Sequence, residues 1–364
     1  MYFEIDKGGG SFDSSYVITK KYTANENVYT KPELLSIYLC TKHLKQEIMS
    51  NQFGKKGWTP DRIKDLTGKT FLITGTTSGT GFEAARILLF KGAKVVMLNR
   101  NPKKSIETIV KLKETLGDDI DVSAIKMDLG DQESVKNAAK EVLETVSQID
   151  ALMCNGAIAQ TPKRELTKQG WELQMGVNYF GHFTLQSLLY PLIEKSKGRI
   201  VTVGSMGYDM GIKAIKFDDL SWKKDYTPNN AYSQSKLAQI MSMYELNDRL
   251  KDAGKSYVKA YACHPGSSRT SLISTNGSFM MKMIFGIMKL TPLTQPAENG
   301  AYPQLMCATE PNLDENGFYG PTGRSNWVGP VGAHEIKPHA KDKAALKKLW
   351  ALSEKETGMN WEIK

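Results

Sequence analysis

Short apolar runs alternate with helix-like stretches along most of the chain. The runs are rich in β-branched residues, and they cover residues 70–74, 93–98, 122–127, 150–154, 199–203 and 257–263, with a further short run at 317–319. The stretches between them carry apolar residues at helical spacing. This alternation is typical of a parallel sheet covered by helices on both faces. It predicts an α/β fold with one large domain, which suits a chain of 364 residues.

The first apolar run leads into a glycine-rich turn. Gly75, Gly79 and Gly81 stand between the predicted strand and a stretch of helical spacing at 82–90. Glycines in this position allow a tight turn and the close approach of a pyrophosphate to the helix N-terminus. The spacing Gly-x-x-x-Gly-x-Gly differs from the commoner Gly-x-Gly-x-x-Gly, and a turn without a ligand is the alternative. The turn predicts a dinucleotide site whose further contacts are Thr77, Ser78 and Thr80.

The second apolar run ends in Asn99 and Arg100, and Lys103 and Lys104 follow. Enzymes that prefer NAD usually have a carboxylate about twenty residues after the glycine turn, where it bonds the ribose hydroxyls. An arginine can instead pair with a 2′-phosphate through two hydrogen bonds. The sequence therefore favours NADP(H) over NAD(H). The alternative is that Arg100 is a solvated residue at the start of the next helix.

Tyr232 and Lys236 lie four residues apart in a helix-like stretch, so their side chains share one helix face. A nearby positive charge favours the phenolate and is expected to lower the phenol pKa from about 10. Such a tyrosine can give a proton to a carbonyl oxygen or take one from an alcohol. The spacing alone is weak evidence, because the first 42 residues carry it twice more. The surrounding motifs decide its meaning.

Seven motifs, in order over about 200 residues, resemble those of the short-chain dehydrogenase/reductase family. They are the glycine turn, Asp128-Leu129, Asn155-Gly156-Ala157, Asn178, Ser205, the Tyr232/Lys236 pair and Pro265-Gly266. The resemblance runs from about Trp58 to the C-terminus and implies a single Rossmann-type doubly wound sheet. It also implies that the cofactor contacts Asp128, Leu129, Asn155, Gly156, Ala157, Tyr232, Lys236, Pro265, Gly266 and Thr270.

The resemblance assigns catalytic roles to Asn178, Ser205, Tyr232 and Lys236. Tyr232 is expected to act as general acid toward a carbonyl being reduced, and as base in the reverse direction. Lys236 is expected to lower the Tyr232 pKa and to bond the nicotinamide ribose. Ser205 would hold the substrate oxygen, and Asn178 would support a water-linked proton path past Lys236. The nicotinamide supplies the hydride chemistry, and the protein supplies position and electrostatics.

The third motif departs from the family pattern. The usual Ala-Gly order is inverted at Gly156 and Ala157, and Cys154 replaces the first of two asparagines. Glycine and alanine are both small enough to let a cofactor lie against the strand end. We interpret Cys154 as a buried small hydrophobe instead of a redox group.

Several segments resemble the retinol-dehydrogenase-like branch, among them residues 58–69, 217–222 and 317–321. The expected function is NADP(H)-dependent hydride transfer to or from a lipophilic carbonyl or alcohol. A catalytically silent NADP(H)-binding regulator or scaffold is one alternative. Another is reduction of a C=C bond, as in protochlorophyllide reductases, which look similar around Cys154. Those enzymes typically carry an insertion before the catalytic tyrosine, for which the 26 residues between Ser205 and Tyr232 leave little room.

Residues 271–300 lie where this family places its substrate lid. Within them, residues 279–290 include four methionines, which form a soft and adaptable apolar surface. We expect a lid for a lipophilic substrate. A helix packed on the core or on a second subunit is the alternative.

The composition of the chain bears on which classes of partner are expected. The net charge of +9 is spread along the chain, which gives no support for nucleic-acid binding. The four cysteines have neither metal-ligand spacing nor a disulfide framework, which favours a reducing, cytoplasmic location and no bound metal. No apolar run reaches the roughly 18 residues of a spanning helix. Peripheral contact with a membrane and assembly into a homo-oligomer are both compatible with the sequence.

The first 48 residues lie outside the family resemblance and mix three consecutive glycines with polar residues. Residues from Met49 onward would make an ordinary start for this branch. The hypothesis is that Met49 is the native initiator and that residues 1–48 are non-native or poorly ordered. A genuine N-terminal arm is the alternative.

Overall fold

The computed structural model describes residues 52–268 and 293–363. The chain divides into two units, Met1–Leu44 and Lys45–Lys364, and all the described residues belong to the second. The predictions for residues 1–48, for Thr270 and for most of the lid lie outside the described residues.

The described helices, in chain order, are η1 (Pro60–Arg62), α2 (Gly79–Phe90), α3 (Pro102–Leu116), α4 (Gln132–Thr145), α5 (Leu173–Met175), the π-helix η2 (Gly176–Phe180), α6 (Gly181–Lys195), η3 (Met206–Asp209), α7 (Pro228–Asp252), α10 (Ala297–Thr309), η4 (Pro338–Lys341) and α11 (Lys343–Thr357).

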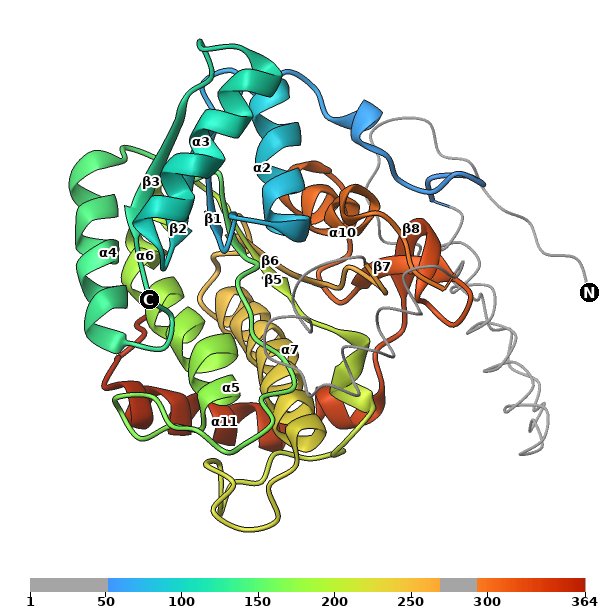
Figure 1. The fold of residues 1–364 in the computed structure, drawn as a ribbon. Helices are drawn as coiled ribbons and strands as arrows, with labels where there is room; N and C mark the ends of the chain where they lie inside the picture. Colours follow the sequence, from blue (N-terminus) through green and yellow to red (C-terminus); the bar gives the residue numbers. More distant parts are fainter. Residues whose placement is uncertain (1–51, 269–292, 364) are drawn as a thin grey trace, which may run out of the picture. The chain divides into compact units, whose positions relative to one another are not determined.

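The strands described form one sheet in the order β3-β2-β1-β4-β5-β6-β7-β8 (Figure 1). Their bounds are β1 (Thr70–Thr74), β2 (Lys94–Asn99), β3 (Val122–Lys126), β4 (Ala151–Cys154), β5 (Arg199–Val203), β6 (Lys259–Cys263), β7 (Phe318–Gly323) and β8 (Val328–His334). Strands β1 to β7 pair in parallel, and β8 pairs antiparallel to β7. The predicted doubly wound parallel sheet is confirmed. Strand β8 was not predicted.

Helices cover both faces of this sheet (Figure 1). Successive side chains of a strand point to opposite faces, and β1 shows the result. Phe71 and Ile73 pack in a core cluster with α2, α3 and α10, whereas Leu72 packs in a second cluster with α4, α6, α7 and α11. The sheet is therefore buried on both sides, as a mostly parallel sheet requires. Its strands present their carboxyl ends at one edge, which leaves that edge for a site.

Side-chain caps fix the starts of several helices, among them α3, α7 and α11. Asn101 accepts a hydrogen bond from the Lys104 amide before α3, and Thr227 accepts one from the Asn230 amide before α7. Proline occupies the first position of both helices, where its missing N–H costs nothing. Asp342 caps α11 in the same way. The start of α7 matters most, because this helix carries Tyr232 and Lys236.

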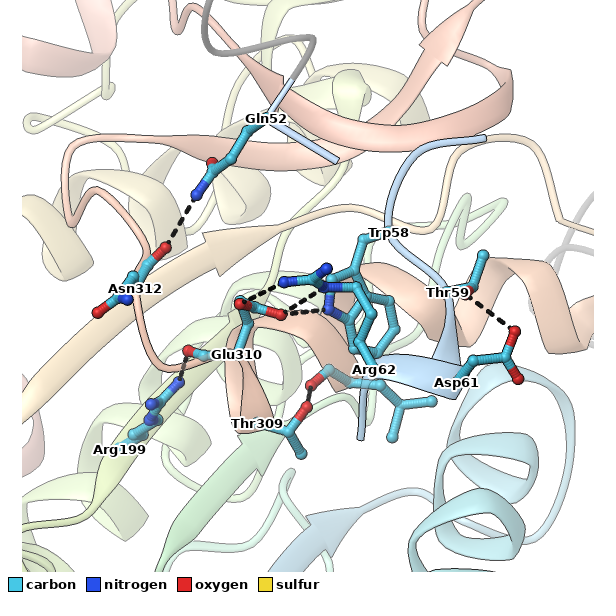
Figure 2. A network of polar contacts seen from close by, with 10 residues as sticks. Gln52, Trp58, Thr59, Asp61, Arg62, Arg199, Thr309, Glu310 and Asn312 are labelled. Carbon is cyan, nitrogen blue, oxygen red and sulfur yellow. Dashed lines mark hydrogen bonds and ion pairs between the residues drawn. The ribbon is translucent and has the colours of Figure 1, made fainter. Parts of the chain in front are cut away.

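Glu310, directly after α10, joins three distant segments (Figure 2). Its carboxylate accepts hydrogen bonds from Trp58 Nε1 at 2.9 Å and from Arg62 Nε at 3.0 Å and Nη2 at 3.1 Å. Its carbonyl accepts a hydrogen bond from Arg199 Nη1, at the start of β5, at 2.7 Å. Only 8% of Glu310 is exposed, so its charge needs these partners. The segment before β1 is thereby fixed to α10 and to the sheet.

We expect Glu310→Ala to lower the free energy of unfolding by about 1–3 kcal/mol, because the buried Trp58 N–H then loses its acceptor. Arg62 adds little, since about half of its side chain is exposed and solvent screens the pair. Urea unfolding measures the change. Glu144→Ala, which removes an exposed carboxylate, is the control and should shift stability by no more than about 0.5 kcal/mol. Equal losses for the two variants would contradict the role of Glu310.

In the part of the chain that the structure describes, no helix has both the length and the apolar character to cross a membrane. Residues 52–268 and 293–363 also contain no group of three or more His, Cys, Asp or Glu side chains arranged to hold a metal ion.

Candidate active site

Strand β1 passes into α2 through the predicted glycine turn. Gly75 and Gly79 have φ angles of 71° and 62°, a region that favours glycine. A Cβ atom at Gly81 would lie 2.2 Å from the Gly75 carbonyl oxygen, so no side chain fits there. Thr77 is partly buried and Ser78 is exposed at the same turn. The turn ends at the N-terminus of α2, where amide groups and the helix dipole suit an anionic group such as a phosphate.

Asn155, directly after β4, holds the glycine turn in place. Its Nδ2 donates to the carbonyl oxygens of Thr74 at 2.9 Å and Gly75 at 3.0 Å. Its Oδ1 accepts from Thr80 Oγ1 at 3.0 Å and from Gln304 Nε2 at 3.2 Å. Gln304 comes from α10, and nothing in the sequence around it indicated this contact. The side chains of Asn155 and Thr80 therefore shape the turn.

The residues after β4 pack closely against the end of β1. The Gly156 amide donates to Thr74 Oγ1 at 2.7 Å, and a Cβ at Gly156 would lie 3.1 Å from Leu129 Cδ1. Ala157, which follows, is partly buried. Cys154 is fully buried, and burial raises the pKa of its thiol to about 12. A thiol that stays protonated agrees with our interpretation of Cys154 as a small hydrophobe.

Arg100 and Asp128 line one cavity of about 400 Å³ at the ends of β2 and β3. Lys126 and Asp131 lie in the same lining, so the cavity carries both signs of charge. Asn99, just before Arg100, is buried and accepts a hydrogen bond from the Thr76 amide at 2.8 Å. Asn99 therefore supports the glycine turn, whereas Arg100 is exposed, as is Lys126 in the same lining.

Ser205 and Tyr232 lie side by side. Ser205 follows β5, and its Oγ accepts a hydrogen bond from the Gly207 amide at 3.0 Å. A Cβ at Gly207 would lie 2.8 Å from Tyr232 Cε1, so this turn fits closely around the phenol ring. Burial raises the pKa of the Tyr232 phenol, and the neighbouring Ser205 hydroxyl lowers it by a smaller amount. At neutral pH the phenol therefore carries its proton.

Lys236 is almost fully buried, at 2% exposure. Its Nζ donates to the Val203 carbonyl oxygen at 3.0 Å and to Gln239 Oε1 at 2.9 Å, and it lies 5.9 Å from the centre of the Tyr232 ring. Burial lowers the pKa of this amine to about 7. We expected Lys236 to lower the Tyr232 pKa, but the phenol pKa is raised. Burial is the largest influence on the phenol pKa, and Lys236 is directed away from the phenol, to the β5 carbonyl oxygen and to Gln239.

Asn178 lies in the π-helix η2, between the β4 loop and α7. Its Nδ2 donates to the Ile158 carbonyl oxygen and to Ser235 Oγ, both at 2.9 Å, and its Oδ1 accepts from the Ile158 amide at 2.9 Å. Its carbonyl oxygen lies 2.8 Å from His182 Nδ1. A π-helix often marks a functional position. Here it brings a fully buried amide between the two loops of the site.

The His264-Pro265-Gly266 segment follows β6. His264 Nε2 lies 2.6 Å from His334 Nε2 of β8, and burial lowers the pKa of both, to about 4 for His334. Gly266 has a φ of 63°, and a Cβ there would lie 2.3 Å from the Trp327 carbonyl oxygen. The Pro265 carbonyl accepts hydrogen bonds from nearby side chains. These contacts fix the segment at the same edge of the sheet as Ser205.

The sequence matches known dehydrogenases over most of its length. A family profile described as short chain dehydrogenase matches residues 69–217. Retinol dehydrogenase 14 of Homo sapiens is 34% identical over 308 residues, which cover 81% of this chain and 88% of that protein. Retinol dehydrogenase 12 of Homo sapiens is 31% identical over 300 residues, covering 82% and 89%.

Solved structures of similar fold include proteins of the same kind. An uncharacterised protein from Mycobacterium paratuberculosis aligns with a TM-score of 0.69 and 33% identity, covering 84% of this chain and all of that one. A short-chain dehydrogenase from Sphingobium yanoikuyae, solved in complex with NADPH, aligns with a TM-score of 0.50 and 21% identity, covering 65% and 83%. At that identity the second likeness shows the fold alone.

Proposed function

The chain belongs to the short-chain dehydrogenase/reductase family, in its retinol-dehydrogenase-like branch, and we propose that it is an NADP(H)-dependent oxidoreductase. It transfers a hydride between the nicotinamide and a carbonyl or alcohol group of a lipophilic small molecule. The observation that carries the proposal is the placement of Tyr232 beside Ser205, with Lys236 behind its ring, at the sheet edge that holds the glycine turn.

The residues at this edge fit a dinucleotide. The glycine turn is packed so closely that no Cβ fits at Gly75, which lies against the backbone of Gly156, or at Gly81, which lies against the Gly75 carbonyl oxygen. The N-terminus of α2 offers amides to a pyrophosphate. Arg100 and Asp128 line one cavity, in which the arginine would pair with a 2′-phosphate and the acid would meet the adenine. Strand β2 ends in Asn99 and is followed by Arg100, so these two positions carry no carboxylate that could bond the ribose hydroxyls, although Asp128, Asp131 and Glu133 lie elsewhere in the lining. This charge pattern favours NADP(H).

The chemistry of the site follows from its proton-handling groups. When bound, the nicotinamide supplies or accepts the hydride. Tyr232 donates a proton to the carbonyl oxygen in reduction and takes one from the alcohol in oxidation. Its raised pKa keeps the phenol protonated, which suits reduction. Ser205 donates a hydrogen bond to the substrate oxygen, and the Lys236 amine, with a pKa of about 7, can exchange a proton at neutral pH.

The lipophilic character of the substrate is inferred from the relatives. Several carry the name retinol dehydrogenase, and retinol is a lipophilic alcohol. The methionine-rich part of the expected lid supports the same class of substrate.

The proposal is tested by a cofactor-oxidation screen. NADPH and NADH are each offered with aldehydes and ketones of graded size and polarity, for the wild type and for Arg100→Asp. We expect turnover with NADPH, fastest for apolar carbonyls. We expect Arg100→Asp to weaken NADPH binding by about 10- to 100-fold, because a charged hydrogen bond is lost, and to leave NADH binding nearly unchanged.

A matched control separates the local effect from net charge. Lys195→Asp makes the same charge change at the exposed far end of α6 and should leave both affinities unchanged. Tight NADPH binding without turnover of any carbonyl would favour the silent NADP(H)-binding regulator. If Arg100→Asp and Lys195→Asp weaken NADPH binding equally, Arg100 does not set the preference.

A further inference from the structure

A single chain of hydrogen bonds runs from β4 to the helix of Tyr232, and His182 is its central member. His182 lies in the first turn of α6 with 1% of its surface exposed. Its Nδ1 is 2.8 Å from the Asn178 carbonyl oxygen, and its Nε2 is 3.0 Å from Thr74 Oγ1. Thr74 Oγ1 in turn accepts the Gly156 amide at 2.7 Å. One imidazole thus contacts both the π-helix and the end of β1.

The partners fix the protonation of this imidazole. A backbone carbonyl can only accept, so Nδ1 of His182 carries the hydrogen that bonds Asn178. Nε2 then has a free lone pair and accepts from the Thr74 hydroxyl. The oxygen of that hydroxyl still has a lone pair for the Gly156 amide. Burial lowers the pKa of His182 to about 4, and the positive charge of Lys236 acts in the same direction. The ring is neutral at physiological pH, with one tautomer.

The chain continues from Asn178 to the helix of the tyrosine. Asn178 Nδ2 donates to Ser235 Oγ at 2.9 Å, and Ser235 Oγ donates to the Tyr232 carbonyl oxygen at 2.8 Å. On each side of Asn178 a hydroxyl or an imidazole both accepts and donates, so the bonds within each half of the chain strengthen one another. Asn178, the middle residue of the π-helix, is thus held by His182 at its backbone carbonyl and by Ser235 at its side-chain amide.

We propose that His182 is a positioning residue that sets the place of Asn178, and through it of Tyr232, relative to the end of β1. This inference rests on the proposed function for its effect on turnover. Its structural part, a connection from Gly156 to α7, holds for the protein without cofactor. A misplacement of about 1 Å at a reacting group can cost 10²-fold in rate. We therefore expect loss of the His182 contacts to lower kcat more than cofactor affinity.

Three variants separate the two nitrogen contacts. His182→Phe keeps the ring volume and removes both hydrogen bonds. His182→Asn keeps a donor close to the position of Nδ1 and loses the contact to Thr74. Thr74→Val keeps the bond to Asn178 and removes the hydroxyl. We expect kcat to fall about 10- to 100-fold in His182→Phe, and to recover most of that loss in His182→Asn. Thr74→Val should weaken cofactor binding with a smaller change in kcat.

Hydrogen exchange on the cofactor-free protein gives a readout that does not depend on turnover. We expect amide exchange across residues 176–181 to become about tenfold faster in His182→Phe and to stay near wild type in His182→Asn. Gln186→Met, which removes a buried polar contact to Cys154 one turn along α6, is the control and should leave these amides unchanged. If the wild type turns over no carbonyl, the proposed function fails, but this exchange pattern still tests His182.

Two results would overturn the inference. One is a folded His182→Phe protein with wild-type exchange at residues 176–181. The other is an equal loss of kcat in His182→Phe and His182→Asn, which would show that the Nδ1 bond to Asn178 has no special part. If His182→Phe does not fold, His182→Asn and Thr74→Val decide the matter, since both keep the bond to Asn178. Turnover close to that of the wild type in both supports the inference, and a loss of kcat of about 10- to 100-fold in both would overturn it.

Discussion

Tyr232→Phe is expected to lower kcat by about 10²–10⁴-fold, which is the range that a positioned general acid contributes. The phenol is the group beside Ser205 that can give a proton to a substrate oxygen, and its raised pKa keeps that proton in place. Phenylalanine retains the ring that packs against Gly207, so the fold should persist. Steady-state kinetics with the best carbonyl from the screen measure the loss. Fluorescence titration should show NADPH binding close to that of the wild type.

Tyr244→Phe provides a control on the same helix. Its hydroxyl donates to the Asn316 carbonyl oxygen at 2.9 Å, three turns from Tyr232 and outside the site. This variant should keep nearly all of its turnover. Wild-type rates in Tyr232→Phe would show that Tyr232 is not the proton donor. Equal losses in the two variants would indicate damage to α7 instead of lost chemistry.

Lys236→Met is expected to remove most turnover, by about 10²-fold or more, because the amine exchanges protons beside the phenol. It is also expected to change the pH dependence of stability. In the folded protein the Lys236 pKa is lowered to about 7, from an ordinary value of 10.5. Between these two values the unfolded chain binds a proton that the folded protein does not. Stability therefore rises with pH in that window.

Lys236→Met lacks this amine, so its stability relative to that of the wild type should fall as the pH rises through this window. The free energy of unfolding of Lys236→Met should be most favourable relative to that of the wild type below pH 7, where the wild type must bury a charge. That difference should shrink as the pH rises from about 7 to 10.5. Urea unfolding at pH 6, 8 and 10 measures it. Lys251→Met, an exposed lysine near the end of α7, should leave turnover unchanged and show no such trend. A difference that does not depend on pH would contradict the buried charge.

The predicted sheet is confirmed, because its first seven strands coincide with or overlap the predicted runs, even where polar or turn-forming residues interrupt the run, as in β3 and β7. Strand β8 escaped prediction for a local reason. Its sequence contains Gly329, Pro330 and Gly332, which break the alternation that marks a strand. Its pairing to β7 also includes an irregularity between Pro321 and Gly323. An edge strand tolerates such residues, and tertiary pairing supplies what the local sequence lacks.

Some residues of the candidate site could be predicted from the sequence, and others could not. Tyr232, Ser205 and the glycine turn could be placed from motifs, since their spacing reflects local geometry. His182 and Gln304 could not, because each gains its role from partners far along the chain. A buried histidine on an apolar helix has no sequence mark that separates a structural contact from a functional one. The expected effect of Lys236 on the phenol pKa was wrong, because spacing on a helix does not reveal which acceptor an ammonium group will bond.

The contacts of Glu310 also bear on how the protein is made. Trp58 and Glu310 are 252 positions apart in the chain. During synthesis, strands β1 to β5 can pair once residue 203 has left the ribosome, but Trp58 lacks its acceptor Glu310 until more than a hundred further residues have followed. At about 5–20 residues per second this delay lasts several seconds or longer. Through that interval Trp58 is a newly made apolar surface without its cover, and a chaperone that binds exposed aromatic segments would meet it there.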